Sequence, residues 1–231
     1  MGSEETKAII ETAKAAQEIA KTTGKTIDAA QSLGEFVGKF IGGPLTQASG
    51  IVEDKLKYLR WERQVRLMQR SQQFLREMGL EVPSRRIPLN VAIPLLQAAS
   101  MEEDDELQDI WAKLLVNAAN ANSGVEVTRS LISILENFGP LEAKVLQAIF
   151  DAPADVCPDG IVATTNLPSS YLNSGNNNAI PDLPSESVQL ALWNLKRLGC
   201  IDSAGMWDSG IENVRITSLG RALVRACTVN G

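Results

Sequence analysis

The sequence of 231 residues contains no histidine. Without histidine the chain cannot form Ser-His-Asp or Cys-His catalytic sites, histidine metal sites or a histidine-based pH switch. It also lacks the glycine-rich loops that hold phosphates and dinucleotides, and the G-x-S-x-G turn of serine hydrolases. We therefore predict that the protein is not an enzyme and that it carries no cofactor.

Paired cysteines and long apolar runs are also missing. The three cysteines are widely spaced and form no Cys-x-x-Cys pair, which is typical of reduced thiols in the cytosol. No run of 18 apolar residues occurs, and the first residues are charged and amphipathic rather than continuously apolar. We therefore expect a cytoplasmic protein without an ordinary membrane-spanning helix.

The charge balance limits the choice of partners. The net charge is −6, which disfavours a protein built mainly to grip nucleic acid or an anionic membrane. Hydrophobic residues make up 44% of the chain, which is enough for a substantial core in one large domain or two ordinary ones.

The stretch GEFVGKFIGG, residues 34–43, places glycines one helical turn apart along the edge of an apolar face. A helix over residues 32–42 is too short to span a membrane, and the following Gly-Gly-Pro ends it. Its small-residue edge suits close packing against another helix, within the chain or between copies. The alternative is contact with a membrane surface after a trigger. The candidate contact residues are Gly34, Gly38, Gly42, Phe36 and Phe40.

A long helix is predicted over residues 51–78, with apolar residues on one face and a row of arginines on the other. Such a row is most often solvated or paired with an acidic helix nearby. It could also meet phosphates or lipid headgroups. The row consists of Arg60, Arg63, Arg66 and Arg70.

An acidic helix follows at SMEEDDELQDIWAKLL, residues 100–115. Ser100 with Glu103 three residues later matches a capping box, and the helix macrodipole stabilises negative charge in a first turn. Carboxylates three or four residues apart share a helix face, so Glu102, Glu106 and Asp109 are candidate metal ligands. Carboxylate metal sites in helical bundles usually add histidine, so we favour a structural helix start over a metal site.

The C-terminal third changes character. It reads as two helices separated at Gly139-Pro140, a polar loop or insertion at 152–184, another helix, two short strands and a last helix. This order predicts a winged-helix-like domain. Its would-be recognition helix has basic residues only at its C-terminal end, which disfavours DNA binding through this domain.

The predicted fold class is therefore mainly α: a helical N-terminal region followed by a C-terminal winged-helix-like α+β domain. We divide the chain into three parts, namely an amphipathic arm over residues 1–50, a helical domain over 51–123, and the winged-helix-like domain over 125–231.

The segments GPLTQASGIVEDKLKYLRWERQ and ASMEEDDELQDIWAKLL, with the ending LWNLKRLGCI…VRITSLGRALVRAC, resemble the bacterial Abi-alpha (abortive infection alpha) family. The similarity covers roughly residues 42–227. It implies a bacterial intracellular protein associated with defence against phage, and it brings no catalytic residues.

We therefore expect a non-enzymatic defence factor that acts through a protein partner, through homo-oligomers, or through triggered contact with the inner membrane. The alternative is a regulator that binds nucleic acid through the winged helix or the arginine row.

Overall fold

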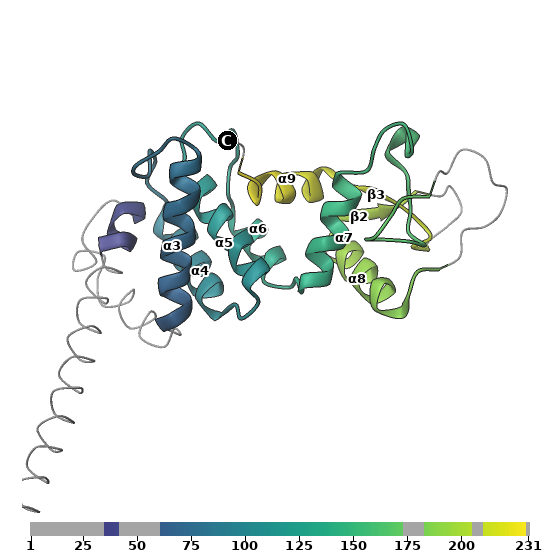
Figure 1. Cartoon of the computed structure of the whole chain (residues 1–231), viewed down its shortest axis with the longest axis horizontal. Coiled ribbons are helices and arrows are strands. Elements are labelled where there is room, and N and C mark those ends of the chain that lie inside the picture. Colours follow the sequence, from purple (N-terminus) through teal and green to yellow (C-terminus); the bar gives the residue numbers. More distant parts are fainter. Residues whose placement is uncertain (1–34, 42–60, 173–182, 205–209, 230–231) are drawn as a thin grey trace, which may run out of the picture.

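The computed structural model describes residues 35–41, 61–172, 183–204 and 210–229. This part of the chain is mainly helical, with a small antiparallel sheet near its C-terminal end (Figure 1). Helices α3, α4 and α5 lie at one end of an elongated molecule, and α7, α8 and the sheet lie at the other. The predicted mainly α class with a smaller β component is confirmed.

Three helices form the first end: α3 (Trp61–Glu77), α4 (Leu89–Met101) and α5 (Asp105–Ala118). They pack against one another. Each supplies buried side chains at three- and four-residue spacing, which places them on one helix face. The predicted helix over 51–78 is confirmed from residue 61 onward, and its first ten residues lie outside the described ranges. The shared core includes Leu67, Phe74, Leu95, Ala99, Trp111 and Leu115.

The predicted start of the acidic helix was wrong by one turn. Ser100 belongs to the last turn of α4, where its buried hydroxyl donates to the carbonyl oxygen of Leu96 at 2.6 Å. The N-cap of α5 is Asp104, whose carboxylate accepts from the backbone N–H of Leu107 at 2.9 Å. Both residue types can cap a helix, but a negative charge is further stabilised by the macrodipole. The Ser100–Glu103 capping box is therefore not formed.

The predicted break at Gly139-Pro140 is confirmed. Helix α6 (Arg129–Leu135) ends before it, and α7 (Pro140–Phe150) begins with the proline. Proline at the first helical position loses no hydrogen bond, because that N–H has no partner inside the helix. The Glu142 carboxylate accepts from the Gly139 backbone N–H at 3.0 Å and closes the first turn.

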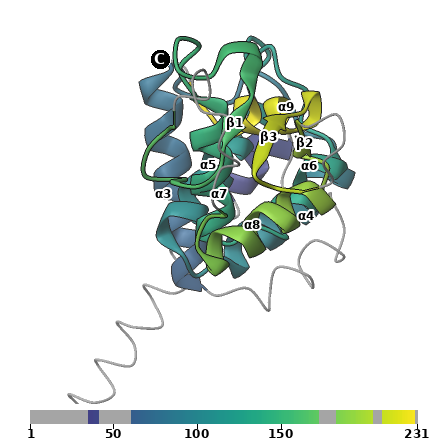
Figure 2. The same ribbon diagram turned by 90° about the vertical axis from the view of Figure 1, so that its right-hand side faces the viewer.

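The C-terminal end contains a three-stranded sheet in the order β1-β3-β2. Both pairs are antiparallel, with Val162 opposite Val214 and Ile201 opposite Ile216. Figure 2 looks onto this end and shows α8 below the strands and α9 above them. The elements are the 3-10 turn Pro158–Gly160, β1 (Val162–Ala163), α8 (Glu186–Arg197), β2 (Ile201–Ser203), β3 (Asn213–Ile216) and α9 (Ser218–Ala226).

The sequence predicted the last two strands but not β1. This strand lies inside the stretch 152–184, which was expected to be a polar loop or an insertion. Two residues are too few to show an alternating pattern, and β1 exists because Val162 and Ala163 pair with β3. The order of helices and strands agrees with the expected one. The assignment to the winged-helix class stays a prediction.

One hydrophobic core joins the two ends. It contains buried residues from the segment 35–41, from α3 to α7, from the sheet and from α9. Asn117 of α5 reinforces this connection, because its buried side-chain amide donates to the carbonyl oxygens of Ala226 and Thr228, both at 2.8 Å. The predicted boundary near residue 124 is therefore crossed by both apolar and polar contacts.

Candidate functional site

The arginine row of α3 faces the acidic side of α5. Arg63 reaches Asp105 with 2.6 Å between Nη1 and Oδ1. Arg70 donates from Nε to Asp109 Oδ1 at 2.6 Å, and Arg66 donates from Nη2 to the same oxygen at 3.3 Å. The hydrogen bond to Asp109 raises the pKa of Arg70, so its positive charge is held more firmly.

These pairs give the arginine row a partner within the chain. A carboxylate beside each guanidinium neutralises charge that a phosphate would otherwise attract, so binding of nucleic acid would have to displace an existing ion pair. Arg60, the first member of the predicted row, lies outside the described residues.

The three candidate metal ligands do not converge. Glu102 accepts from the backbone N–H of Asp104 at 2.9 Å, and Glu106 forms an ion pair with Lys144 at 2.8 Å. Asp109 binds the arginines of α3. Within the described ranges, no group of three or more acidic or sulfur-bearing side chains is placed to hold a metal ion.

The segment 35–41 is helical, as predicted, and its apolar face is buried against its own chain. The rings of Phe36 and Phe40 lie 4.8 Å apart, and the Phe40 carbonyl accepts from the backbone N–H of Ile87 at 2.9 Å. A small cavity of about 230 Å³ separates this segment from α3. Gly38 is partly exposed, and Gly34 and Gly42 lie outside the described residues. The two aromatic candidates thus fill the core in this structure.

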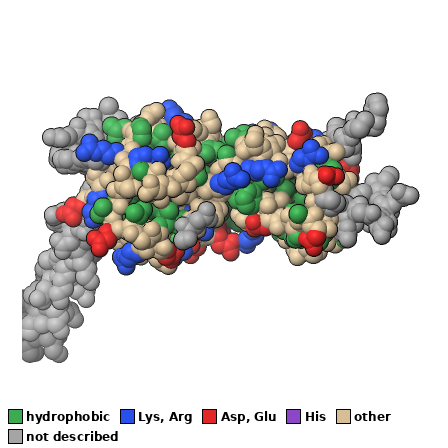
Figure 3. All heavy atoms as spheres, turned by 90° about the horizontal axis from the view of Figure 1, so that it is seen from above, with side chains coloured by type: hydrophobic (Ala, Val, Ile, Leu, Met, Phe, Trp, Pro, Cys, Tyr) green, Lys and Arg blue, Asp and Glu red, His purple; other side chains and the backbone are tan. Residues whose placement is uncertain are grey.

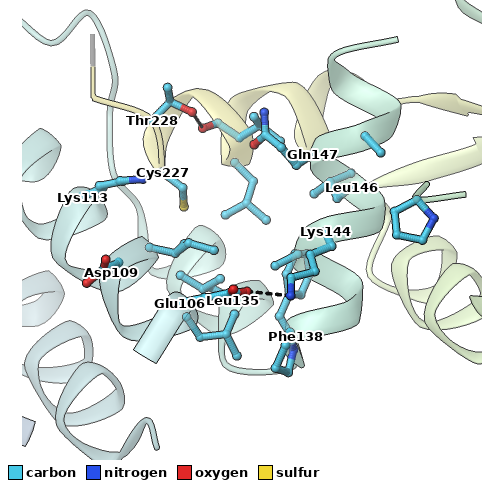
Figure 4. Close-up of a pocket in the computed structure, with 18 of the residues that line it drawn as sticks. Glu106, Asp109, Lys113, Leu135, Phe138, Lys144, Leu146, Gln147, Cys227 and Thr228 are labelled. Carbon is cyan, nitrogen blue, oxygen red and sulfur yellow. Dashed lines mark hydrogen bonds and ion pairs between the residues drawn. The ribbon is translucent and has the colours of Figure 1, made fainter. Parts of the chain in front are cut away.

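The described helices also enclose a larger open cleft, with a volume of about 800 Å³, between α5, α7 and α9 (Figure 4). Its walls are apolar side chains from α6, α7 and α9, and its rim carries charges of both signs from α5 and α7. Three segments that are distant in the sequence meet here because α7 and α9 pack on each other and on α5. The wall includes Leu135, Leu146, Leu223 and Val224, and the rim includes Glu106, Asp109, Lys113 and Lys144.

Ionic contacts set the charge at the rim. Lys144 and Glu106 face each other across the cleft from α7 and α5 (Figure 4), and both side chains are more than half exposed. The hydrogen bond to Glu106 raises the pKa of Lys144, so the positive charge of this amine is further stabilised. Lys113 lies over the ring of Phe74, with 5.4 Å between Nζ and the ring centroid.

Two further groups of the cleft, Cys227 and Tyr171, also have raised pKa values. Cys227 is partly exposed, yet the apolar walls desolvate its thiol and raise the pKa to about 12, while Lys113 lowers this pKa by less. Desolvation raises the pKa of Tyr171, whose hydroxyl donates to the carbonyl oxygen of Ala148 at 2.8 Å. A protonated lysine, thiol and phenol are poor nucleophiles.

Sequence reasoning did not find this cleft. Lys113 lies on α5, Lys144 lies on α7 and Cys227 directly follows α9, and nothing in their local sequence marks them as part of one site. Their proximity depends on how α7 and α9 dock onto α5.

The fold and the cleft together define a mainly helical protein with a small antiparallel sheet and an open interhelical cleft. The family model described as "Abortive infection alpha" matches residues 62–227, and the chain belongs to this family. The match includes α3 to α9 and therefore the arginine–aspartate contact and the cleft. Comparisons with curated proteins and with solved structures gave no significant match.

The length and hydropathy of the helices bear on contact with membranes. Among the described residues, no helix is both long enough and apolar enough to cross a membrane.

Proposed function

We propose that the protein is a non-enzymatic phage-defence factor that acts by binding another protein through the cleft between α5, α7 and α9. The family membership supports the role in abortive infection. The observation that carries the mode of action is the cleft itself, in which apolar walls are combined with a rim of both charge signs. An amphipathic protein segment has the matching chemistry, since apolar side chains provide affinity and charged ones provide orientation.

The charges of the molecule support a protein partner over nucleic acid. The net charge is −6, and Arg63, Arg66 and Arg70 of α3 are paired with aspartates of α5. Figure 3 looks down on the face that carries α9 and shows basic side chains near its centre with acidic side chains gathered along one edge. Tight binding of a phosphate backbone needs several unpaired cations along one path. A surface of mixed charge is better suited to another protein.

Triggered membrane contact through the segment 35–41 is the second candidate mode of action. It is motivated by the amphipathic pattern of this segment and would require Phe36 and Phe40 to leave the core, where both are nearly inaccessible to solvent. Exposing one such aromatic side chain costs about 1.5–3 kcal/mol. The cleft needs no rearrangement of this kind, and for this reason we favour it.

A variant that fills the cleft tests the proposal. Gln147 lies on α7 at the cleft and its side chain is exposed, so Gln147→Trp adds bulk there without disturbing the core. The matched control is Ser130→Trp, at an exposed position of α6 that is not part of the cleft wall. Both variants are expressed in a bacterial host that is challenged with phage, and plaque formation and survival of infected cells are counted.

We expect Gln147→Trp to lose protection while its circular dichroism and thermal unfolding match those of the unmodified protein. Ser130→Trp should protect normally. Full protection by Gln147→Trp would contradict the role of the cleft. If Arg63→Ala and Arg66→Ala abolish protection together with a salt-dependent shift of DNA or RNA, the nucleic-acid alternative is favoured instead.

A further inference from the structure

The outer face of α8 carries an apolar pair that its own chain does not cover. Leu190 is 66% exposed and Trp193 is 47% exposed, although α8 buries Val188 and Leu192 on its inner side. Scattered apolar residues on a surface are ordinary, but two large ones on adjacent turns form a continuous patch. In the winged-helix prediction, α8 is the helix that would contact DNA. The patch on it is apolar and therefore offers no hydrogen-bond donor or positive charge to a phosphate.

Charged residues stand at both ends of this patch. Glu186 lies one turn before Leu190, and Arg197 lies one turn after Trp193. At 3.6 residues per turn, these four positions fall within about 60° of one another around the helix, so they form one narrow stripe. Among the described residues neither charge has an ion-pair partner, since Arg197 donates to the neutral side chains of Asn194 and Asn137. The stripe in order is Glu186, Leu190, Trp193 and Arg197, all of them exposed.

The stripe is complementary to itself. Its midpoint falls between Ala191 and Leu192, and a two-fold axis through this point exchanges the two ends of the helix. Such an axis places Glu186 of one copy opposite Arg197 of the other, and it places Leu190 opposite Trp193. This is the requirement of a symmetric homodimer interface, in which the same patch is used by both subunits. The antiparallel arrangement also pairs opposite ends of the two helix dipoles.

We propose that two copies of this chain associate through α8, packed antiparallel about this two-fold axis. A stripe with acid at one end and base at the other matches its own reversed copy in both charge and apolar content. A strand of nucleic acid would be repelled by Glu186 and would find cations only near the C-terminal end of the stripe, at Arg197 and at Lys196, whose Nζ lies 5.1 Å from the centroid of the Trp193 ring. The contact of one helix with another buries less than the roughly 800 Å² per partner of a standard interface. We therefore expect a dimer that dissociates in the micromolar range.

The surface is distinct from the cleft of the proposed function, because α8 contributes no residue to the cleft wall. The two proposals are consequently tested separately: association is measured as mass in solution, without reference to defence. A homodimer carries two copies of the cleft. Two linked clefts would bind more tightly to a partner that contains several identical units.

Charge reversal provides the decisive experiment. Sedimentation equilibrium of the full-length protein over a range from about 1 to 200 μM should show a shift from 25.0 kDa toward twice this mass. Glu186→Arg and Arg197→Glu, made singly, each place like charges at both ends of the contact and should weaken association about tenfold at low salt. The double variant restores opposite charges and should recover the original affinity. An equimolar mixture of the two single variants should also form a mixed dimer.

Leu190→Asp should abolish the dimer, and Val82→Asp is its control because Val82 is 55% exposed on a different part of the surface. Circular dichroism confirms that each variant is folded. If the protein stays monomeric at 200 μM, the proposal is overturned, and a different protein becomes the candidate partner of the stripe. A dimer that is unaffected by the single reversals, or is not rescued by the double variant, overturns it equally, because the contact then lies elsewhere or has another register.

Discussion

Asp109 is one of two aspartates through which α5 contacts the arginine row, the other being Asp105. The Asp109 carboxylate accepts hydrogen bonds from Arg66 and Arg70, and its side chain is 23% exposed while that of Arg70 is 27% exposed. A charge-assisted hydrogen bond that is partly removed from water contributes more than an exposed ion pair. On the same helix, Glu106 pairs with Lys144 in a contact where both side chains are more than half exposed.

These two carboxylates give a prediction with a built-in control. Asp109→Asn removes the negative charge between two arginines and should lower the free energy of unfolding by about 1–3 kcal/mol. Glu106→Gln makes the equivalent change at the exposed pair and should lower it by less than about 0.5 kcal/mol. Urea denaturation followed by circular dichroism measures both. Equal losses in the two variants would show that the partial burial of the Asp109 contact has no energetic consequence.

Single residues also show how far local sequence reasoning extends. Gly79 follows α3 in the left-handed region, at φ of +72°, and glycine after a periodic segment is a helix stop that the sequence alone displays. Ser100 was assigned to the helix start, whereas the N-cap is Asp104, and both residue types can cap a helix. The choice between them depends on the burial of Ser100 beneath neighbouring helices, which its local sequence does not report.

Helix α9 is positioned by its close approach to the start of β2. A Cβ atom placed on Gly220 would overlap the carbonyl oxygen of Cys200 and would lie 2.9 Å from Cγ1 of Ile216. Thr217 supports the same contact, because its hydroxyl donates to the carbonyl oxygen of Gly199 at 2.6 Å and accepts from the backbone N–H of Gly220 at 3.0 Å. The element can therefore dock at this distance only with glycine at position 220.

Gly220→Ala should destabilise the protein by at least about 2 kcal/mol, because the methyl group meets backbone that cannot move aside easily. The comparison is Gly79→Ala, where a Cβ atom would meet open space and only the positive φ is unfavourable. That change should cost about 1 kcal/mol. Thermal unfolding measures the loss of stability in each variant. A smaller loss for Gly220→Ala than for Gly79→Ala would mean that α9 can shift away from β2 at little cost in free energy.

The strands illustrate why elements differ in how well they can be predicted. The strands β2 and β3 were expected because short apolar segments flank a glycine-containing turn. The strand β1 has two residues and forms because Thr164 also joins this edge, where its backbone N–H donates to the carbonyl oxygen of Glu212 at 2.9 Å. A pairing that brings together residues about 50 positions apart leaves no local signal.

Over the whole molecule, the two ends are joined by more than the chain that connects them. The amide of Asn117 donates to two carbonyl oxygens at the C-terminal end of α9, and the hydrophobic core is continuous past the predicted boundary. The division into residues 51–123 and 125–231 remains a prediction. The contacts favour cooperative unfolding of both parts.

We predict that calorimetry shows one transition for the unmodified protein. Asn117→Asp replaces the donor with a carboxylate that faces two carbonyl oxygens, and it should lower the melting temperature by several degrees, corresponding to about 2 kcal/mol. It should also separate the unfolding of the two ends. Asn137→Asp is the control, since this amide donates to the Ser133 carbonyl oxygen at an exposed site. Two transitions in the unmodified protein would contradict the coupling.

Helix periodicity, the helix stop at Gly79 and the break at Gly139-Pro140 could be read from the sequence, because each depends on chemistry within about one helical turn. The family could be recognised in the same way, from segments that are continuous in the chain. The arginine row could be located from the sequence, but its partner could not. The aspartates that pair with it lie on α5, about 40 residues later in the chain. The cleft and the role of Asn117 arise from the docking of α7 and α9 onto α5. The segment 35–41 is buried by residues that follow it far along the chain, including Ile87, whose backbone N–H donates to the carbonyl oxygen of Phe40. Packing and ion pairing between distant segments depend on their separation in space, whereas helix signals depend on separation along the chain.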